Sequence, residues 1–109
     1  MDDCLFCKIT QKEISADLLY ESDSVIAFPD INPSKDIHIL VVPKKHVEDF
    51  LELKDSKLMT KLFNTIQVMI KKQGLAKKGY RILFNGGGAA AIDHLHIHII
   101  GPIDRNFRI

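Results

Sequence analysis

Three histidines near the C-terminal end of the chain alternate with branched apolar residues, in the run His94-Leu95-His96-Ile97-His98-Ile99-Ile100. This alternation, rich in β-branched residues, predicts a strand over 94–100. Successive side chains of a strand point to opposite faces, so we expect the three imidazoles on one face, about 6.6–6.8 Å apart, and the apolar residues between them on the other. A neutral imidazole can act as a nucleophile, exchange protons or bind a metal ion near pH 7. The row therefore indicates a catalytic site or a metal site, because packing alone rarely supplies hydrogen-bond partners for three such rings.

Cys4 and Cys7 form a Cys-x-x-Cys pair at the other end of the chain. A redox role would require this pair between a strand and a helix of a βαβ unit, which is not its predicted setting. A zinc role would require two further ligands. The first residues are acidic and lack the apolar stretch of a secretory leader, so we expect a cytoplasmic protein whose cysteines are thiolates or metal ligands rather than a disulfide.

Hydrophobic periodicity predicts the elements that position these residues. The principal helix spans 56–73, where Leu58, Leu62, Ile66 and Met69 recur at i+3 and i+4 spacing. Around it we expect a short helix or turn at 4–10, strands at 18–21, 25–28 and 37–42, one or two helical turns within 46–53, and strands at 80–85 and 94–100. This order favours an α+β fold with a mainly antiparallel sheet.

Length and composition limit the classes of function. The chain has 109 residues, which predicts a single domain over 1–109. With 15 basic and 14 acidic residues its net charge is +1, so nothing favours binding to nucleic acid or to a membrane surface. No apolar stretch approaches the length of a transmembrane helix.

The histidine row has the pattern His-φ-His-φ-His-φ-φ, where φ is an apolar residue, and this pattern resembles the signature of the histidine triad family. The segments 4–9, 27–33 and 38–46 also resemble the Hint-like branch of that family, as do residues 79–81 with Asn85 and Gly86. The resemblance implies a five-stranded, mainly antiparallel sheet with one long and one short helix. It also implies a homodimer in which two such sheets join into one of ten strands.

The resemblance assigns catalytic roles to three histidines. His96 is implied to be the nucleophile, which attacks the α-phosphorus of a nucleoside 5′-phosphate derivative and forms a covalent nucleotidyl-histidine that water then hydrolyses. Such a nucleophile needs its other ring nitrogen held by a partner, which the family implies is a backbone carbonyl on a neighbouring element. His98 is implied to donate a hydrogen bond to a phosphate oxygen, and His38, on an adjacent strand, to contact the same phosphate.

The resemblance also implies a binding site for a purine nucleotide. Asp30 would accept hydrogen bonds from the ribose hydroxyls, and Asn85 would contact the phosphate or the leaving group. The residues implied to hold the base are apolar: Phe6, Ile14, Phe28 and Ile31. Ordinary core packing is the alternative for these four, and for Ile14 it has equal weight.

The family resemblance supplies the two further metal ligands. In the branch with an N-terminal Cys-x-x-Cys, zinc is implied to be bound by Cys4, Cys7, His46 and His94. Four protein ligands would form a closed tetrahedral site, which is typical of structural zinc (Zn2+) rather than catalytic zinc. The alternative is a pair of free thiols packed near the start of the chain.

One loop departs from the Hint pattern. Ala90 and Ala91 stand where that pattern carries a glutamine and a hydroxyl residue, and the loop is about two residues short. Alanine side chains offer no donor or acceptor to a leaving group. We therefore expect backbone N–H groups of the run 86–91 to hold the phosphate, and Asp93 or a water to replace the missing hydroxyl. The C-terminal segment 101–109 is also shorter than the longer Hint tails, which leaves the leaving group open.

The favoured hypothesis is a hydrolase of purine nucleoside 5′-phosphoramidates or acyl-adenylates that acts through His96. The first alternative is a weakly active or inactive nucleotide-binding regulatory dimer, because of Ala90 and Ala91. The second alternative is a dinucleoside polyphosphate hydrolase, which is less favoured because that branch depends on the missing glutamine.

Overall fold

The computed structural model describes residues 3–107, so the ends of the predicted domain and of the segment 101–109 lie outside the described residues. Its elements in chain order are α1 (Leu5–Thr10), β1 (Tyr20–Glu21), β2 (Val25–Pro29), β3 (Ile37–Pro43), a 3-10 turn η1 (Phe50–Glu52), α2 (Ser56–Lys72), β4 (Arg81–Phe84) and β5 (Ile97–Gly101). The predicted α+β class, with a five-stranded sheet, one long helix and one short helix, is confirmed.

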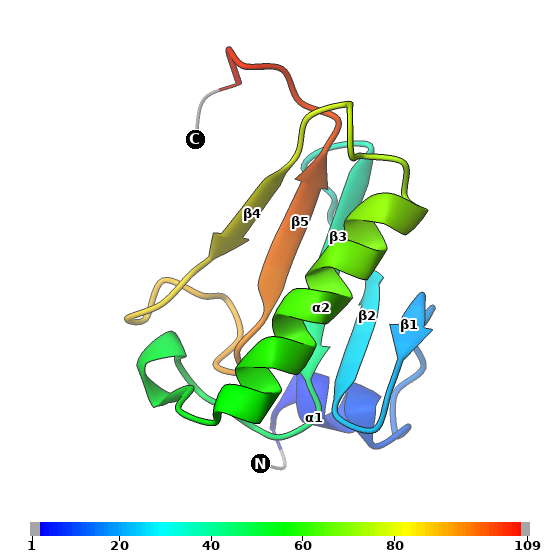
Figure 1. The fold of residues 1–109 in the computed structure, drawn as a ribbon. Coiled ribbons are helices and arrows are strands. Elements are labelled where there is room, and N and C mark those ends of the chain that lie inside the picture. The colour runs from blue at the N-terminus through cyan, green and yellow to red at the C-terminus, as the bar shows by residue number, and fades with distance from the viewer. Residues whose placement is uncertain (1–2, 108–109) are drawn as a thin grey trace.

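The sheet has the strand order β1-β2-β3-β5-β4, and every neighbouring pair is antiparallel. Figure 1 shows α2 lying across one face of this sheet. Ile97 and Ile99 point to that face and pack with Leu62 and Met69 of α2. The opposite face carries a smaller apolar cluster in which Phe6 and Ile9 of α1 pack on residues of β2 and β3, namely Ile26, Phe28, Leu40 and Val42. The sheet therefore separates the larger core beneath α2 from the smaller cluster beneath α1, and the candidate site lies on the α1 side.

The long helix begins where the sequence predicts. Asp55 is its N-cap, and its carboxylate accepts hydrogen bonds from the backbone N–H groups of Lys57 and Leu58. The helix ends at Lys72, one residue before the predicted end, and Gly74 follows in the left-handed conformation at φ +71°. Within residues 3–107, no helix is both long and apolar enough to cross a membrane.

The predicted strand over 94–100 is wrong at its start, because β5 begins only at Ile97. The β3–β5 ladder runs from the pair Ile37 and Gly101 to the pair Val41 and Ile97. Two residues further along β3 stands Pro43, which has no N–H to donate to a ladder. The chain before Ile97 instead binds the segment after β3, where the N–H of Leu95 donates to the carbonyl of Val47 at 2.6 Å.

Other predicted elements differ from the structure only in extent. The first strand is reduced to Tyr20–Glu21, and the predicted strand at 80–85 to Arg81–Phe84. The helical turns expected within 46–53 amount to η1 alone. Short elements such as these depend on side-chain contacts with the rest of the molecule, so sequence periodicity sets their ends poorly.

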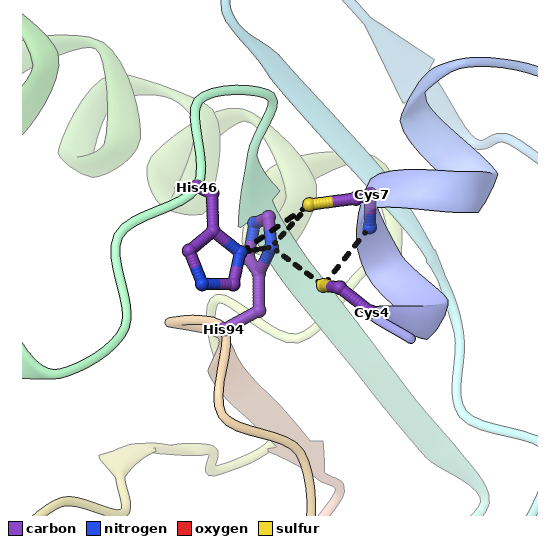
Figure 2. Close-up of side chains that lie close together, drawn as sticks. All are labelled: Cys4, Cys7, His46 and His94. Atoms are coloured by element: carbon purple, nitrogen blue, oxygen red, sulfur yellow. Dashed lines mark hydrogen bonds between the residues drawn. The ribbon is translucent and has the colours of Figure 1, made fainter. Parts of the chain in front are cut away.

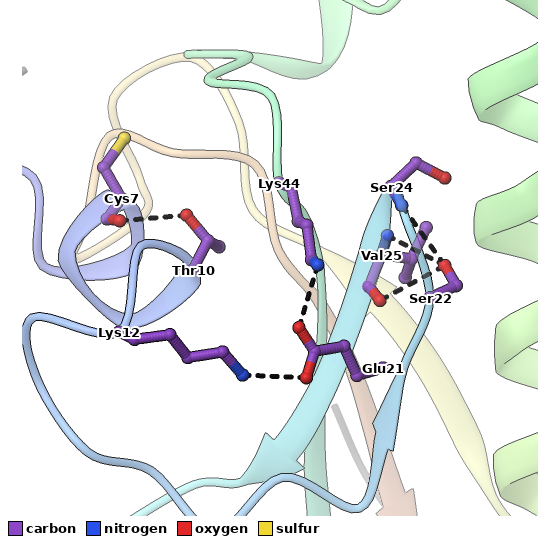
Figure 3. A network of polar contacts seen from close by, with 8 residues as sticks. All are labelled: Cys7, Thr10, Lys12, Glu21, Ser22, Ser24, Val25 and Lys44. Atoms are coloured by element: carbon purple, nitrogen blue, oxygen red, sulfur yellow. Dashed lines mark hydrogen bonds and ion pairs between the residues drawn. The ribbon is translucent and has the colours of Figure 1, made fainter.

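A polar contact at the edge of the sheet ties α1 to the strands (Figure 3). The Glu21 carboxylate lies 2.7 Å from Lys12 Nζ and 2.8 Å from Lys44 Nζ, which come from the turn after α1 and the end of β3. Hydrogen bonds from these two ammonium groups lower the pKa of Glu21 to about 2. Each pair is open to solvent and contributes little stability, but together they link the turn after α1, β1 and the end of β3.

Candidate functional site

A cavity of about 640 Å³ opens on the α1 side of the sheet. Seven of the sequence-predicted site residues line it, which are Phe6, Ile14, Phe28, Asp30, Ile31, His96 and His98. Ile31 is 90% exposed although it is apolar, so it is available to a ligand at the rim rather than used in the core. His38 and Asn85 do not line the cavity, but each contacts His98.

Sequence reasoning missed several lining residues, among them Ile9, Leu40 and Ile92. The first two could have been found from spacing. Ile9 lies one helical turn after Phe6, and Leu40 lies two strand residues after His38, so each shares a face with a residue that was identified. Ile92 has no such signal, because it lies in an irregular loop.

His96 is held in the form that a nucleophile requires. Its ring is buried, and its Nδ1 lies 2.8 Å from the backbone carbonyl oxygen of His94. A carbonyl only accepts hydrogen bonds, so Nδ1 carries the proton and donates it, and Nε2 of the neutral ring keeps a free lone pair. The expected carbonyl on a neighbouring element is wrong: the partner belongs to the same segment, two residues earlier.

The rings of His96 and His98 lie closer together than a regular strand would place them. The ring centroids of His96 and His98 are 5.0 Å apart, not the expected 6.6–6.8 Å. Phe6 of α1 packs edge-on against both His96 and His94, so these two rings lie on the α1 side, and His98 lines the cavity on that side as well. His94, however, is directed at the two cysteines and takes no part in lining the cavity.

A chain of hydrogen bonds defines the proton positions on His38 and His98. The backbone N–H of Ser34 donates to Nδ1 of His38 at 3.0 Å, so the neutral His38 ring carries its proton on Nε2. That Nε2 lies 2.9 Å from Nδ1 of His98 and 3.4 Å from Oδ2 of Asp30. Nδ1 of His98 must then accept, which places the His98 proton on Nε2, where it is available to a ligand.

The same proton positions argue against a metal ion at Asp30, His38 and His98, although their ligand atoms lie within 4.8 Å of one another. A metal ion would need a lone pair on Nε2 of His38, and the Ser34 N–H forces a proton onto that atom. The group is therefore a hydrogen-bonded relay that ends on a donor.

Burial keeps the two imidazole rings of the relay neutral. It lowers the pKa of His98 to about 4, repulsion from His96 and His38 in their protonated forms acts in the same direction, and Asp30 opposes the shift. The pKa of His38 is also lowered, mainly by burial, and again Asp30 opposes the shift. Both rings are therefore uncharged near pH 7.

This depressed pKa predicts a pH-dependent stability. Between pH 6.5 and about 4 the unfolded chain binds a proton at residue 98 that the folded protein does not, so the free energy of unfolding should fall as the pH falls through this range. Between pH 6.5 and pH 5 we expect the free energy of unfolding of His98→Asn to fall by roughly 1 kcal/mol less than that of wild type. This figure allows for the partial exposure of the ring. Urea unfolding at both pH values measures this difference, and equal losses in the two proteins would contradict the assignment.

At Gly87, the loop that departs from the Hint pattern differs from the prediction that backbone N–H groups of 86–91 hold the phosphate. The N–H of Gly87 donates to Oδ1 of Asp49 at 2.9 Å, so this group is not free to bind a phosphate. Among residues 3–107, the loop contributes Ala91 and Ile92 to the cavity, and no glycine. Asp93 faces a separate depression with Cys4 and His46, so the structure does not place it where the missing hydroxyl would act.

The second predicted group of residues converges in one place, as Figure 2 shows. Nδ1 of His94 lies 3.2 Å from Sγ of Cys4, 3.5 Å from Sγ of Cys7 and 3.1 Å from Nδ1 of His46. Sγ of Cys7 lies 3.3 Å from Nδ1 of His46. A zinc ion with ordinary bond lengths in a tetrahedral site would require about 3.3 Å between two nitrogens and about 3.5 Å between nitrogen and sulfur. The four donor atoms therefore fit a tetrahedral metal ion.

Hydrogen bonds from the surroundings orient two of these donors. Nε2 of His94 donates to the carbonyl of Pro43 at 2.8 Å, which leaves the lone pair of Nδ1 directed at the cluster. The N–H of Cys7 donates to Sγ of Cys4 at 3.2 Å. Burial, reinforced by Cys4, raises the pKa of the Cys7 thiol to about 11, so a metal ion would have to displace its proton. The carbonyl of His94 also accepts the hydrogen bond from His96, so His94 connects the cluster to a residue that lines the cavity.

Comparisons with known proteins agree with this architecture. The family described as "Scavenger mRNA decapping enzyme C-term binding" matches residues 3–107. The 14 kDa zinc-binding protein of Brassica juncea is 37% identical, over 96% of this chain and 97% of that protein. The adenylylsulfatase HINT1 of Arabidopsis thaliana is also 37% identical, over 94% of this chain and 74% of that protein. The crystal structure of a histidine triad protein from Clostridium difficile is similar with a TM-score of 0.89 and 37% identity, over 99% of this chain and 98% of that one.

Proposed function

This chain belongs to the histidine triad family, and from that premise we propose that it hydrolyses purine nucleoside 5′-phosphoramidates or acyl-adenylates to the nucleoside monophosphate. The observation that carries the proposal is the hydrogen bond from Nδ1 of His96 to the His94 carbonyl, which leaves an unprotonated Nε2 on a residue that lines the cavity. The name of the Arabidopsis relative, an adenylylsulfatase, supports an adenylyl group on the substrate side.

The proposed reaction has two displacements at the α-phosphorus. Nε2 of His96 first forms a bond to phosphorus, and the bond from phosphorus to the leaving amine or carboxylate breaks. Nε2–H of His98 donates to a non-bridging phosphate oxygen, where negative charge develops. Water then attacks the same phosphorus and the bond to His96 breaks, with its electron pair returning to Nε2. The nucleoside monophosphate leaves with the hydroxyl of that water, and the other proton of the water passes to solvent.

The cavity fits the other parts of such a substrate. Asp30 lines it close to His38, where a carboxylate can accept from both ribose hydroxyls. The apolar walls suit a purine ring, and they come from Phe6, Ile14, Phe28 and Ile31. With an alanine in place of the hydroxyl at position 91, the amine must take its proton from water.

The experiment that tests this proposal is incubation of the full-length protein with adenosine 5′-phosphoramidate, with AMP release followed by chromatography. Steady release of AMP, many molecules for each protein molecule, is the expected result. The absence of a hydroxyl at Ala91 favours one alternative, a regulatory dimer that binds purine nucleotide without turnover. Tight binding of AMP in calorimetry with no release from the phosphoramidate would support that alternative and reject the hydrolase.

We further propose that the cluster of Cys4, Cys7, His46 and His94 binds structural zinc. The donor set supports this, because two thiolates with two imidazoles in a closed tetrahedron are typical of structural zinc. The Brassica relative is named a zinc-binding protein, which also supports it. Zinc bound here would tie α1 to the segment that carries His94.

We also propose a homodimer that joins two sheets through β4. This strand is one edge of the sheet, and it carries the apolar Ile82 with 43% of its surface exposed. Ile82→Lys should weaken dimerisation at least tenfold, because a charge would be buried at the joined edge. Sedimentation velocity over a dilution series measures the change. Leu51→Lys, which changes an exposed residue of η1 instead, is the control, and equal behaviour of the two variants would reject this interface.

A further inference from the structure

The 3-10 turn η1 contacts the loop after β4 through Asp49. Oδ2 of Asp49 accepts the N–H of Leu51 at 3.2 Å and so caps η1. Oδ1 of the same carboxylate accepts the N–H of Gly87, 38 residues away, at 2.9 Å. These backbone donors, with Gly87 the larger contributor, lower the pKa of Asp49, so the carboxylate is ionised and the hydrogen bond to Gly87 is charge-assisted.

A second contact holds the other side of the same loop. The ring of Phe50, the next residue after Asp49, packs edge-on against the ring of Phe84 with 5.0 Å between centroids. Phe84 is the last residue of β4 and Gly87 lies three residues later. The segment of Asp49 and Phe50 therefore contacts the chain both before and after Asn85.

Within the loop, the N–H of Ala89 donates to the carbonyl of Gly86 at 3.2 Å and closes a turn around two glycines. Gly87 and Gly88 take positive φ angles of +62° and +90°, and a Cβ added to either would meet no atom within 4 Å. Glycines in open space leave the backbone many accessible conformations. A fixed acceptor such as the Asp49 carboxylate is then an effective way to select one of them.

Asn85 is the residue whose position depends on this arrangement. Its Nδ2 lies 3.5 Å from Nε2 of His98, the atom that presents a proton to the substrate. Nε2 of His98 carries a proton and an amide nitrogen is also a donor, so this is a packing contact and not a hydrogen bond. A small displacement of the loop would remove it. The next residue is close to the carboxylate as well: a Cβ on Gly86 would lie 3.1 Å from Oδ1 of Asp49.

We propose that Asp49 is a positioning residue, which holds the loop after β4 so that Asn85 stays beside His98 during the reaction. The kinetic part of this proposal rests on the proposed hydrolase function, whereas the structural part does not. Asp49 itself does not line the cavity, so it acts through Gly87 and Asn85 and not on the substrate.

The test compares three variants of the full-length protein. Asp49→Ala removes the acceptor, and Asp49→Asn keeps a carbonyl oxygen at the same place without the charge. Asp55→Ala is the matched control, because Asp55 also caps a helix with its carboxylate but does not contact the loop. The first readout needs no substrate: amide hydrogen exchange at Gly87 and the NMR shifts of the Asn85 side-chain amide.

In Asp49→Ala we expect exchange at Gly87 to rise at least tenfold and the Asn85 signals to move. We expect kcat for AMP release to fall about tenfold with KM changed less than twofold. The reason is that the position of Asn85 beside His98 should stabilise the transition state more than the bound ground state. Asp49→Asn should recover most of both effects, and Asp55→Ala should lower stability without either.

Two results would overturn the proposal: unchanged Gly87 exchange in Asp49→Ala, or a loss of kcat that Asp55→Ala reproduces. If the wild-type protein releases no AMP, the hydrolase proposal fails. The exchange and NMR comparison still decides whether Asp49 positions the loop, so the two failures are distinguishable.

Discussion

Replacing His96 with asparagine is expected to abolish the release of AMP while nucleotide binding persists. Removal of the proposed nucleophile should reduce kcat by at least about 10³-fold, because the proposed covalent intermediate can no longer form at residue 96. Asparagine suits this position, since its amide N–H can still donate to the carbonyl of His94 in place of Nδ1. The change therefore removes the attacking atom with little cost to folding.

The measurement is intact mass spectrometry after mixing with an adenosine phosphoramidate and quenching in alkali, since a bond between phosphorus and a histidine nitrogen is labile in acid. Wild type should gain the mass of one adenylyl group, and His96→Asn should gain none. Calorimetric titration with AMP checks that the variant still binds nucleotide.

His98→Asn provides the matched control, because it makes the same substitution on the neighbouring ring. It should slow the reaction by about 10²-fold through loss of a donor to the phosphate, yet still form the adduct. An adduct in His96→Asn, or none in His98→Asn under conditions where wild type is labelled, would contradict the assigned roles.

Loss of the proposed zinc ion is expected to produce the largest change in stability. An ion that binds only the folded chain, present at 100 to 1,000 times its dissociation constant, stabilises the fold by about 3–4 kcal/mol. In a chain of this length, removal of that contribution would lower the melting temperature by roughly 10–20 °C. The effect should be large because the cluster joins α1 to residues after β3 and before β5.

Native mass spectrometry and thermal unfolding of the purified protein, before and after treatment with a chelator, measure this prediction. We expect one zinc ion for each chain, and recovery of the melting temperature on adding zinc but not magnesium. Cys7→Ser should behave like the chelated protein. Thr10→Ala is the control, because it removes a hydrogen bond to the Cys7 carbonyl without touching a donor atom of the cluster. A chelated protein that keeps its melting temperature would reject a structural metal.

Local periodicity in the sequence was sufficient for most of the fold. The spacing of apolar residues located α2 to within one residue at its end, and the alternation of His38 with Leu40 identified the face of β3 that bears the site. Periodicity succeeds here because it records which face of an element is buried, and burial dominates the energy of long elements. The types of His, Cys and Asp residues likewise limited the chemistry before any contact was known.

The tertiary structure decided the arrangement within the site. The missing N–H of Pro43 ends the β3–β5 ladder, which frees His94 to face the cysteines while its carbonyl binds His96. The backbone N–H of Ser34 donates to Nδ1 of His38 and so places the ring proton on Nε2, and the carboxylate of Asp49 accepts the N–H of Gly87. Each of these contacts depends on one hydrogen-bond direction between irregular segments, and no repeating pattern in a sequence encodes such directions. The amino-acid sequence by itself therefore determined which side chains could react. Only the tertiary structure determined which nitrogen of each histidine ring carries the proton.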